Sequence, residues 1–211
     1  MTIVRTPWQS RLRESILIVF SIFLCPLTLK AQNVLPSKDL VFGQVAAGDG
    51  YQSVLTLSNR GYGTYNGTMR FFKGQGELWN LSVNGARVTD GQIAISVEPG
   101  HTSSFTLTRQ ASLESGLAII KSLDLTQNNS IGGNLTYFAY SGSELLDSVG
   151  VTPSTEFLIA GLPFDDFATI GFALANADPG RTASIRLRLF SETSRQIGSV
   201  SMNLAPSSHT A

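Results

Sequence analysis

Hydrophobic and polar residues alternate along most of the chain beyond residue 39. The alternation is clearest where Ile185, Leu187 and Leu189 take turns with Arg186 and Arg188. Side chains of a β-strand point alternately to its two faces, so a period of two predicts strands that are apolar on one face. After residue 31 no stretch of about three helical turns keeps an apolar stripe at helical spacing, so we predict an all-β fold.

Short turn sequences separate these strands. Asn84-Gly85 lies between residues 81–83 and 86–88, and Asn-Gly between two apolar runs is the strongest short-range signal of a β-hairpin. Asp90-Gly91 and Pro99-Gly100 mark further turns. Short strands at close, regular spacing predict an antiparallel β-sandwich of Ig-like architecture.

The first 31 residues have the pattern of a secretory signal peptide with a signal helix. Three arginines precede an apolar stretch at residues 16–29, and Ala31 offers a small residue before a cut at Gln32. The apolar stretch is shorter than the roughly 20 residues that a spanning helix needs. We therefore predict a secreted or cell-surface protein with no stable membrane span after cleavage. Cys25, the single cysteine, would leave with the signal peptide, so disulfides cannot stabilise the fold.

The charge balance after cleavage argues against nucleic acid as a partner. The 211-residue chain has 15 basic and 15 acidic residues, and residues 1–31 contain four of the former and one of the latter, which leaves 11 and 14 and a net charge of −3. Nucleic-acid binding needs a concentrated basic face. The sequence also has no polybasic patch for anionic lipid.

An internal repeat emerges when the strands are compared with one another. Leu57-Ser58-Asn59 reappears as Leu174-Ala175-Asn176, and the turn at residues 98–102 resembles that at 205–210. We predict a linker at 32–38, a first module at 39–153 and an incomplete second module at 154–211. Either the chain is a fragment, or the second module docks on the first and shares its core. The missing strands would leave an unpaired edge at Ser199–Leu204, open to self-association.

The motifs "LTLSN" at residues 55–59, "GTMRFF" at 67–72, "VEPGHTSSF" at 97–105 and "LTYFAYSGSELLDSVGV" at 135–151 carry a family resemblance. The chain resembles a β-sandwich-like module that is repeated in tandem in large, uncharacterised secreted bacterial proteins. These motifs consist of turn and core residues. The resemblance therefore implies a fold, and it brings no catalytic residues.

Few residues suggest chemistry, and we predict no catalytic residue, metal site or cofactor. His101 and His209 follow matched proline-containing turns without neighbouring metal ligands, which favours a structural role. Asp165-Asp166 would point to opposite faces of a strand and is typical of a solvated turn. Residues 124–129 are rich in oxygen ligands but lack the spacing of a calcium loop.

Two loop tyrosines, Tyr62 and Tyr65, form the candidate ligand site. They either stack on a sugar or anchor a partner, or they cover the edge of the sandwich in a long hairpin turn. We predict a non-catalytic secreted or cell-surface β-sandwich module with a structural or adhesive role, whose partner is an unknown protein or glycan. The alternatives are a carbohydrate-binding module that uses both tyrosines, and an enzyme completed by residues beyond Ala211.

Overall fold

The computed structural model describes residues 39–123, 130–154, 160 and 173–211. Every regular element in these residues is a β-strand, which confirms the all-β prediction. The predicted signal peptide and linker lie outside the described residues. A search of the described part of the chain finds no helix long and apolar enough to cross a membrane.

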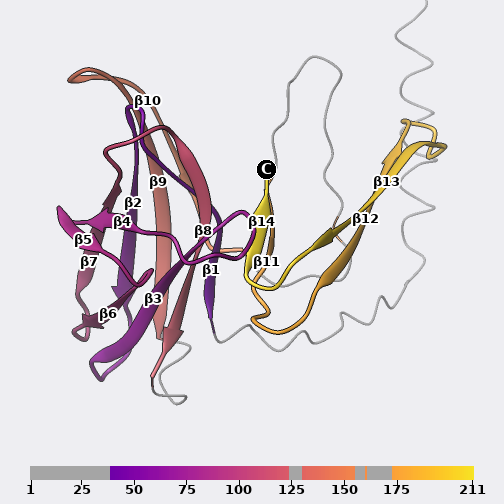
Figure 1. Ribbon diagram of the computed structural model, residues 1–211. Coiled ribbons are helices and arrows are strands. Elements are labelled where there is room, and N and C mark those ends of the chain that lie inside the picture. The colour runs from indigo at the N-terminus through magenta and orange to yellow at the C-terminus, as the bar shows by residue number, and fades with distance from the viewer. Residues whose placement is uncertain (1–38, 124–129, 155–159, 161–172) are drawn as a thin grey trace, which may run out of the picture. The chain divides into compact units, whose positions relative to one another are not determined.

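Fourteen strands occupy the described residues (Figure 1). They are β1 (Leu40–Ala47), β2 (Tyr51–Asn59), β3 (Tyr65–Lys73), β4 (Leu81–Val83), β5 (Ala86–Val88), β6 (Gln92–Val97), β7 (Thr102–Thr108), β8 (Glu114–Ser122), β9 (Ile131–Ser141), β10 (Glu144–Val151), β11 (Leu174–Asn176), β12 (Ala183–Phe190), β13 (Gln196–Leu204) and β14 (Ser208–Thr210).

The first ten strands form an antiparallel β-sandwich. Sheet A has the strand order β1-β8-β3-β6, and sheet B has the order β10-β9-β2-β7-β4-β5. All described pairings within both sheets are antiparallel. The two layers face each other in Figure 1, as the sequence predicts for a sandwich.

The core lies between the two sheets because alternate residues of each strand point inward. Leu55 and Leu57 of β2 are fully buried, while the neighbouring Val54 and Thr56 are partly exposed. The same burial continues across both layers, and the large side chains with no exposed surface include Trp79, Tyr65, Phe42, Phe71, Met69, Leu107, Ile120 and Leu135.

The predicted hairpin at Asn84-Gly85 is confirmed. These two residues have φ angles of 51° and 81° and join β4 to β5, where Val83 pairs with Ala86. Positive φ at both central positions defines the turn whose twist matches that of antiparallel strands, and Asn and Gly adopt it at low cost. Asn84 is held further by the Thr106 amide, which donates to its side-chain oxygen over 2.7 Å.

The last four strands form two small pairs, β11 with β14 and β12 with β13. Ala175 and Ala177 pack against Phe72, Leu117 and Ile119 on the outer face of sheet A. The C-terminal part therefore docks on the sandwich through a separate apolar cluster. None of its described residues belongs to the main core. One of the two alternatives from the sequence supposed that this part docks on the first module and shares its core, and only the docking is seen.

The predicted open edge at Ser199–Leu204 lies in β13, which pairs with Ala183–Arg188 of β12 on one side. Among the described residues β13 has no strand on its other side, so one edge of it is open. Self-association through that edge stays a prediction. The prediction of a module boundary at 153–154 stays a prediction. Ser154 donates its backbone N–H to the Val41 carbonyl over 2.7 Å and so remains tied to the first strand of the sandwich.

Candidate functional site

The two loop tyrosines do not form a shared ligand platform. Tyr62 is fully exposed, whereas Tyr65 begins β3 with no exposed surface. Burial, with a further contribution from the Asp39 charge, raises the pKa of Tyr65 to about 12. Sequence reasoning placed Tyr65 on the loop, but it is the first inward-facing residue of a core strand. A sugar could stack on Tyr62 alone.

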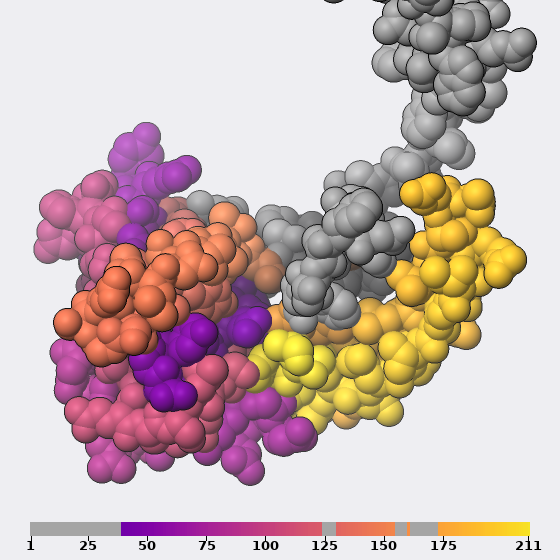
Figure 2. Space-filling model, turned by 90° about the horizontal axis from the view of Figure 1, so that it is seen from above, coloured from indigo at the N-terminus to yellow at the C-terminus, as the bar shows by residue number. Residues whose placement is uncertain are grey.

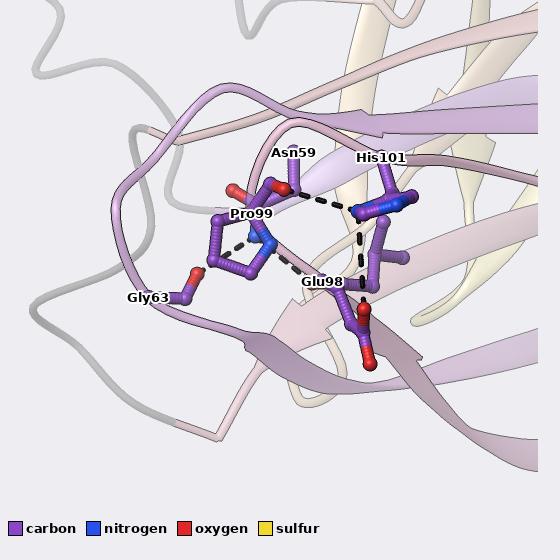
Figure 3. Close-up of polar contacts among 6 residues, drawn as sticks. Asn59, Gly63, Glu98, Pro99 and His101 are labelled. Atoms are coloured by element: carbon purple, nitrogen blue, oxygen red, sulfur yellow. Dashed lines mark hydrogen bonds and ion pairs between the residues drawn. The ribbon is translucent and has the colours of Figure 1, made fainter.

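His101 lies at the exposed end of the sandwich (Figure 3). Its Nδ1 contacts the Pro99 carbonyl oxygen at 3.1 Å and the Glu98 carboxylate at 3.9 Å, and the side chains of His101 and Glu98 are both largely exposed. These contacts link neighbouring residues of one turn. The structural role that the sequence predicts for His101 stays a prediction.

His209 occupies a different environment from His101. It is buried in β14, where its Nε2 lies 3.2 Å from the Ser115 hydroxyl and its backbone N–H donates to the Gly74 carbonyl. Burial lowers the pKa of His209 below its usual value. This histidine helps to attach β14 to the sandwich.

The strand registers correct the predicted match between the two histidines. Ala175 pairs with His209, and the corresponding residue in the first part, Ser58, pairs with Thr102. If the two Leu-x-Asn motifs correspond, as the predicted repeat supposes, His209 matches Thr102, one residue beyond His101. The sequence comparison aligned the two histidines with each other. Their distances from the preceding proline differ by one residue, since His101 follows Pro99 by two residues and His209 follows Pro206 by three.

Two buried asparagines make similar hydrogen bonds, Asn59 at the end of β2 and Asn176 at the end of β11. The Asn59 side-chain amide donates to the carbonyls of Gly63 at 2.8 Å (Figure 3) and Val97 at 2.9 Å. Its side-chain oxygen accepts from the Gly61 N–H. Asn176 makes the corresponding bonds and one more. It donates to Arg181 at 2.7 Å, Leu204 at 3.1 Å and Ala205 at 2.9 Å, and accepts from the Asp178 N–H.

The hairpins that follow each asparagine have the same register. Tyr65 pairs with Val97 in the β3–β6 pair, and Ala183 pairs with Leu204 at the equivalent place in β12–β13. The pairings continue in step until Arg70 opposite Gln92 and Arg188 opposite Ser199. The burial of the two hairpins differs: Met69 and Phe71 of the first have no exposed surface, whereas Leu189, the counterpart of Phe71, is 40% exposed.

The β12–β13 pair has one apolar and one polar face. Its apolar side, called here the hairpin face, consists of Ile185, Leu187, Leu189, Val200 and Met202. Arg186 and Arg188 point to the opposite side with Ser199 and Ser201. The alternation predicted from the sequence is thus present. Leu189 and Val200 of the hairpin face are exposed, Ile185, Leu187 and Met202 are partly buried, and no second sheet of the described residues pairs with or extends this hairpin. Figure 2 shows this hairpin at the yellow end of the colour scale.

A second candidate site is a polar pocket of about 510 Å³ in the sandwich. The segment after β3, the β4–β5 hairpin and the β7–β8 loop meet there. They contribute three cationic side chains, Lys73, Arg87 and Arg109, and one carboxylate, Glu114. We call it the basic pocket.

Glu114 is already neutralised within the basic pocket. One of its oxygens lies 3.2 Å from Arg109 Nη2, and the other accepts a 2.8 Å hydrogen bond from the indole of the buried Trp79. Arg109 also donates to the Ser112 carbonyl over 2.8 Å. Among the described residues, neither Lys73 nor Arg87 forms an ion pair. The pocket thus has an excess of two positive charges.

Sequence reasoning missed the basic pocket because its residues carry no motif. Lys73, Arg87 and Arg109 are spread over three turns and strands, and each by itself is typical of a solvated surface position. Only the packing of sheet A, which holds Lys73, against sheet B, which holds Arg87, brings them to one place.

No metal centre is evident in the described residues, where no group of three or more His, Cys, Asp or Glu side chains could hold an ion. Asp165-Asp166 and the oxygen-rich residues 124–129 lie outside the described residues.

Comparisons with known proteins give little information on family. No family model matches the chain, and a search of curated proteins finds no match. Among solved structures, the chain is similar to the crystal structure of Thermotoga maritima 1070, with 10% sequence identity and a TM-score of 0.40. The similarity covers 56% of this chain and 93% of that one.

Proposed function

We propose that this chain is a non-catalytic, secreted or cell-surface β-sandwich module with a structural and adhesive role. The observation that carries the proposal is the partial exposure of the hairpin face, where Leu189 is 40% and Val200 is 53% exposed. An apolar sheet face gains free energy when another sheet covers it, at about 25 cal/mol for each Å² of apolar surface removed from water. A segment built this way is suited to assembly. The signal-like N-terminus supports an extracellular setting.

An internal repeat relates this partly exposed hairpin to the sandwich strands. In this proposal β11, β12, β13 and β14 repeat β2, β3, β6 and β7, since strand pairing, register and the asparagine hydrogen bonds all correspond. In the first copy β3 also pairs with β8, and β2 with β9. The described residues contain no counterpart of β8 or β9 beside β12 and β11. Both strands of the β12–β13 pair therefore have a free edge among the described residues, and the edge of β12 is the one at which β3 has a second neighbour.

Charge indicates how a second copy of the chain would cover the hairpin. Two copies could pair the free edges of their β12 strands so that both polar faces lie on the same side of the joined sheet. Arg186 and Arg188 of one copy would then lie beside those of the other. Like charges on opposite strands are destabilising. If two hairpin faces packed against each other, the arginines would point away from the contact. We therefore propose self-association through the hairpin face of two copies.

A pair of matched valines tests this proposal. Val200 lies on the hairpin face and is 53% exposed, while Val149 lies on the edge strand β10 and is 56% exposed. We expect Val200→Asp to weaken dimer formation by at least about tenfold, since burial of a charge opposes association. Val149→Asp should leave it unchanged. Sedimentation velocity over a range of concentrations measures both, with thermal unfolding to verify that each variant is folded.

Two results would contradict self-association through the hairpin face. The wild-type protein could remain monomeric at high concentration, or Val149→Asp could weaken the dimer as much as Val200→Asp. The second result would move the contact to β10, whose residues are all exposed along the surface in Figure 2.

Carbohydrate binding through both Tyr62 and Tyr65 has less support as a function, because Tyr65 would have to leave the core.

A further inference from the structure

We infer that the basic pocket binds an acidic saccharide, with Lys73 and Arg87 holding its carboxylate. This inference concerns a surface separate from the hairpin face and does not depend on self-association. The pocket volume of about 510 Å³ falls within the range of small-ligand sites, roughly 300–1,000 Å³.

The charges of the pocket select an anion. Arg109 is committed to Glu114 and to the Ser112 carbonyl, so its charge is largely satisfied within the protein. Lys73 and Arg87 keep their charges available, and a guanidinium is well suited to bind a carboxylate through two parallel hydrogen bonds. This local excess of positive charge occurs in a chain whose part after residue 31 has a net charge of −3. The basic character therefore belongs to the pocket and not to the surface in general.

The remaining lining is suited to a sugar. Asn80, Ser82 and Gln110 offer amide and hydroxyl groups that can both donate and accept hydrogen bonds, as sugar hydroxyls require. Leu78 is 45% exposed at the same place and offers an apolar surface for the C–H face of a pyranose ring. Phosphate-rich nucleic acid would instead need a larger basic surface and no carboxylate in the site.

Glu114 and Trp79 have a positioning role in this site. The buried indole fixes one carboxylate oxygen of Glu114, and the other fixes Arg109, so the wall of the pocket is preorganised. Preorganisation lowers the entropy lost when a ligand binds. This arrangement gives the pocket a defined shape although its cations come from separate loops and strands.

Calorimetric titration with an oligomer of galacturonic acid tests the inference, with the matched oligomer of galactose as the neutral probe. We expect the acidic oligomer to bind and the neutral one to bind at least about tenfold more weakly. Arg87→Gln and Lys73→Gln should each reduce the affinity for the acidic oligomer by about tenfold or more, as loss of a charge-assisted hydrogen bond predicts. Higher salt should weaken binding. Arg186→Gln, which alters an exposed arginine on β12, should leave the affinity unchanged.

Several results would overturn the inference. They are absence of binding to the acidic oligomer, equal binding of the neutral one, tighter binding of inorganic polyphosphate, and equal loss of affinity in Arg186→Gln. The same samples separate this inference from the proposed function. Arg87→Gln should still dimerise as the wild type does, and Val200→Asp should still bind the acidic oligomer.

Discussion

Single buried side chains hold the turns of this protein in place, and Asn59 shows how. Its amide reaches the carbonyls of Gly63 and Val97 and the N–H of Gly61, so one residue satisfies three backbone groups at the end of the sandwich. Asn59 is only 1% exposed. Without the Asn59 side chain, these buried or partly buried backbone groups would lose a hydrogen-bond partner. The free energy lost by leaving such a group unpaired exceeds the net contribution of the hydrogen bond itself.

Asn59→Ala should therefore destabilise the protein strongly. We expect its free energy of unfolding to fall by about 2–4 kcal/mol, in line with the cost of leaving buried polar groups unpaired. Asn134 is an exposed strand residue whose side chain contacts only Thr136 among the described residues, so Asn134→Ala should change stability by less than about 0.5 kcal/mol. Urea denaturation of both variants measures the difference. Equal losses would show that Asn59 has no special role.

The second residue-scale prediction concerns pH. Because burial lowers the pKa of His209 in the folded protein, the neutral ring is favoured there and the unfolded chain binds a proton more readily. The contribution of His209 to stability is therefore present above its unfolded pKa, about 6.5, and is lost as the pH falls below that value toward the lower folded pKa. Attachment of β14 should weaken between pH 7.5 and 5.

Hydrogen exchange of the β14 amides at pH 7.5 and 5 measures this effect. In His209→Gln the pH dependence that comes from this ring should disappear, whereas in His101→Gln, which alters an exposed histidine, it should persist. An unchanged pH dependence in His209→Gln would assign it to other groups.

At the scale of elements, two hairpins with one register have different surroundings. The β3–β6 pair is covered on its inner face by sheet B, and β3 is bonded on its far edge to β8. The β12–β13 pair has neither neighbour among the described residues. A two-stranded hairpin by itself is marginally stable in water. We therefore expect β12–β13 to open more readily than the sandwich strands.

Limited digestion with trypsin tests this expectation. The turn of the hairpin contains Arg195 and Ser194, whose φ of 59° and exposure mark a tight surface turn. We expect the first cut after Arg195. Both carbonyls accept a hydrogen bond, that of Arg195 from the Ser191 N–H over 2.9 Å and that of Arg181 from the Asn176 amide over 2.7 Å. Arg181 should be cut later, because Asn176 is buried, whereas the Ser191–Arg195 bond belongs to the tip of a two-stranded hairpin. Arg195→Gln should slow the first cleavage, and an unchanged rate would show that another bond opens first.

At the scale of the whole molecule, the described residues belong to one compact unit, which comprises residues 36–211. The attachment of the C-terminal part depends on Ala175 and Ala177 against Phe72, and on His209 beside Ser115. Further contact comes where the Pro206 carbonyl approaches Gly76 so closely that a Cβ added there would lie 2.4 Å from it. Close packing of this kind resists separation even when the covalent chain is cut.

After cleavage at Arg195, the fragment from residue 196 should therefore stay bound to the remainder. We expect the two pieces to co-elute in native size-exclusion chromatography and to separate in urea. Gly76→Ala, which adds a Cβ at a φ of 86° and against the Pro206 carbonyl, should loosen this association. Gly142→Ala has a similar backbone strain, with a φ of 60°, but has open space around the new Cβ, so it serves as the control. Separation of the wild-type pieces without urea would contradict the predicted attachment.

Local patterns determined much of this protein. Alternation along the strands predicted an antiparallel β-sandwich, and Asn84-Gly85 predicted a hairpin, because both depend on residues close in sequence. The amphipathic character of residues 185–189 was also evident from sequence. The recurrence of a Leu-x-Asn motif led to the two asparagines whose hydrogen bonds correspond.

Only the tertiary structure decided which of these residues are exposed and can contact a ligand or a partner. It buries Tyr65 at the start of β3, directly after a loop, pairs Ser199–Leu204 with β12, and leaves Leu189 and Val200 of the hairpin face exposed. It also gathers Lys73, Arg87 and Arg109 into one pocket. The physical reason is that exposure and the meeting of charges depend on contacts between segments distant in sequence, whereas the period of a strand depends on the strand alone.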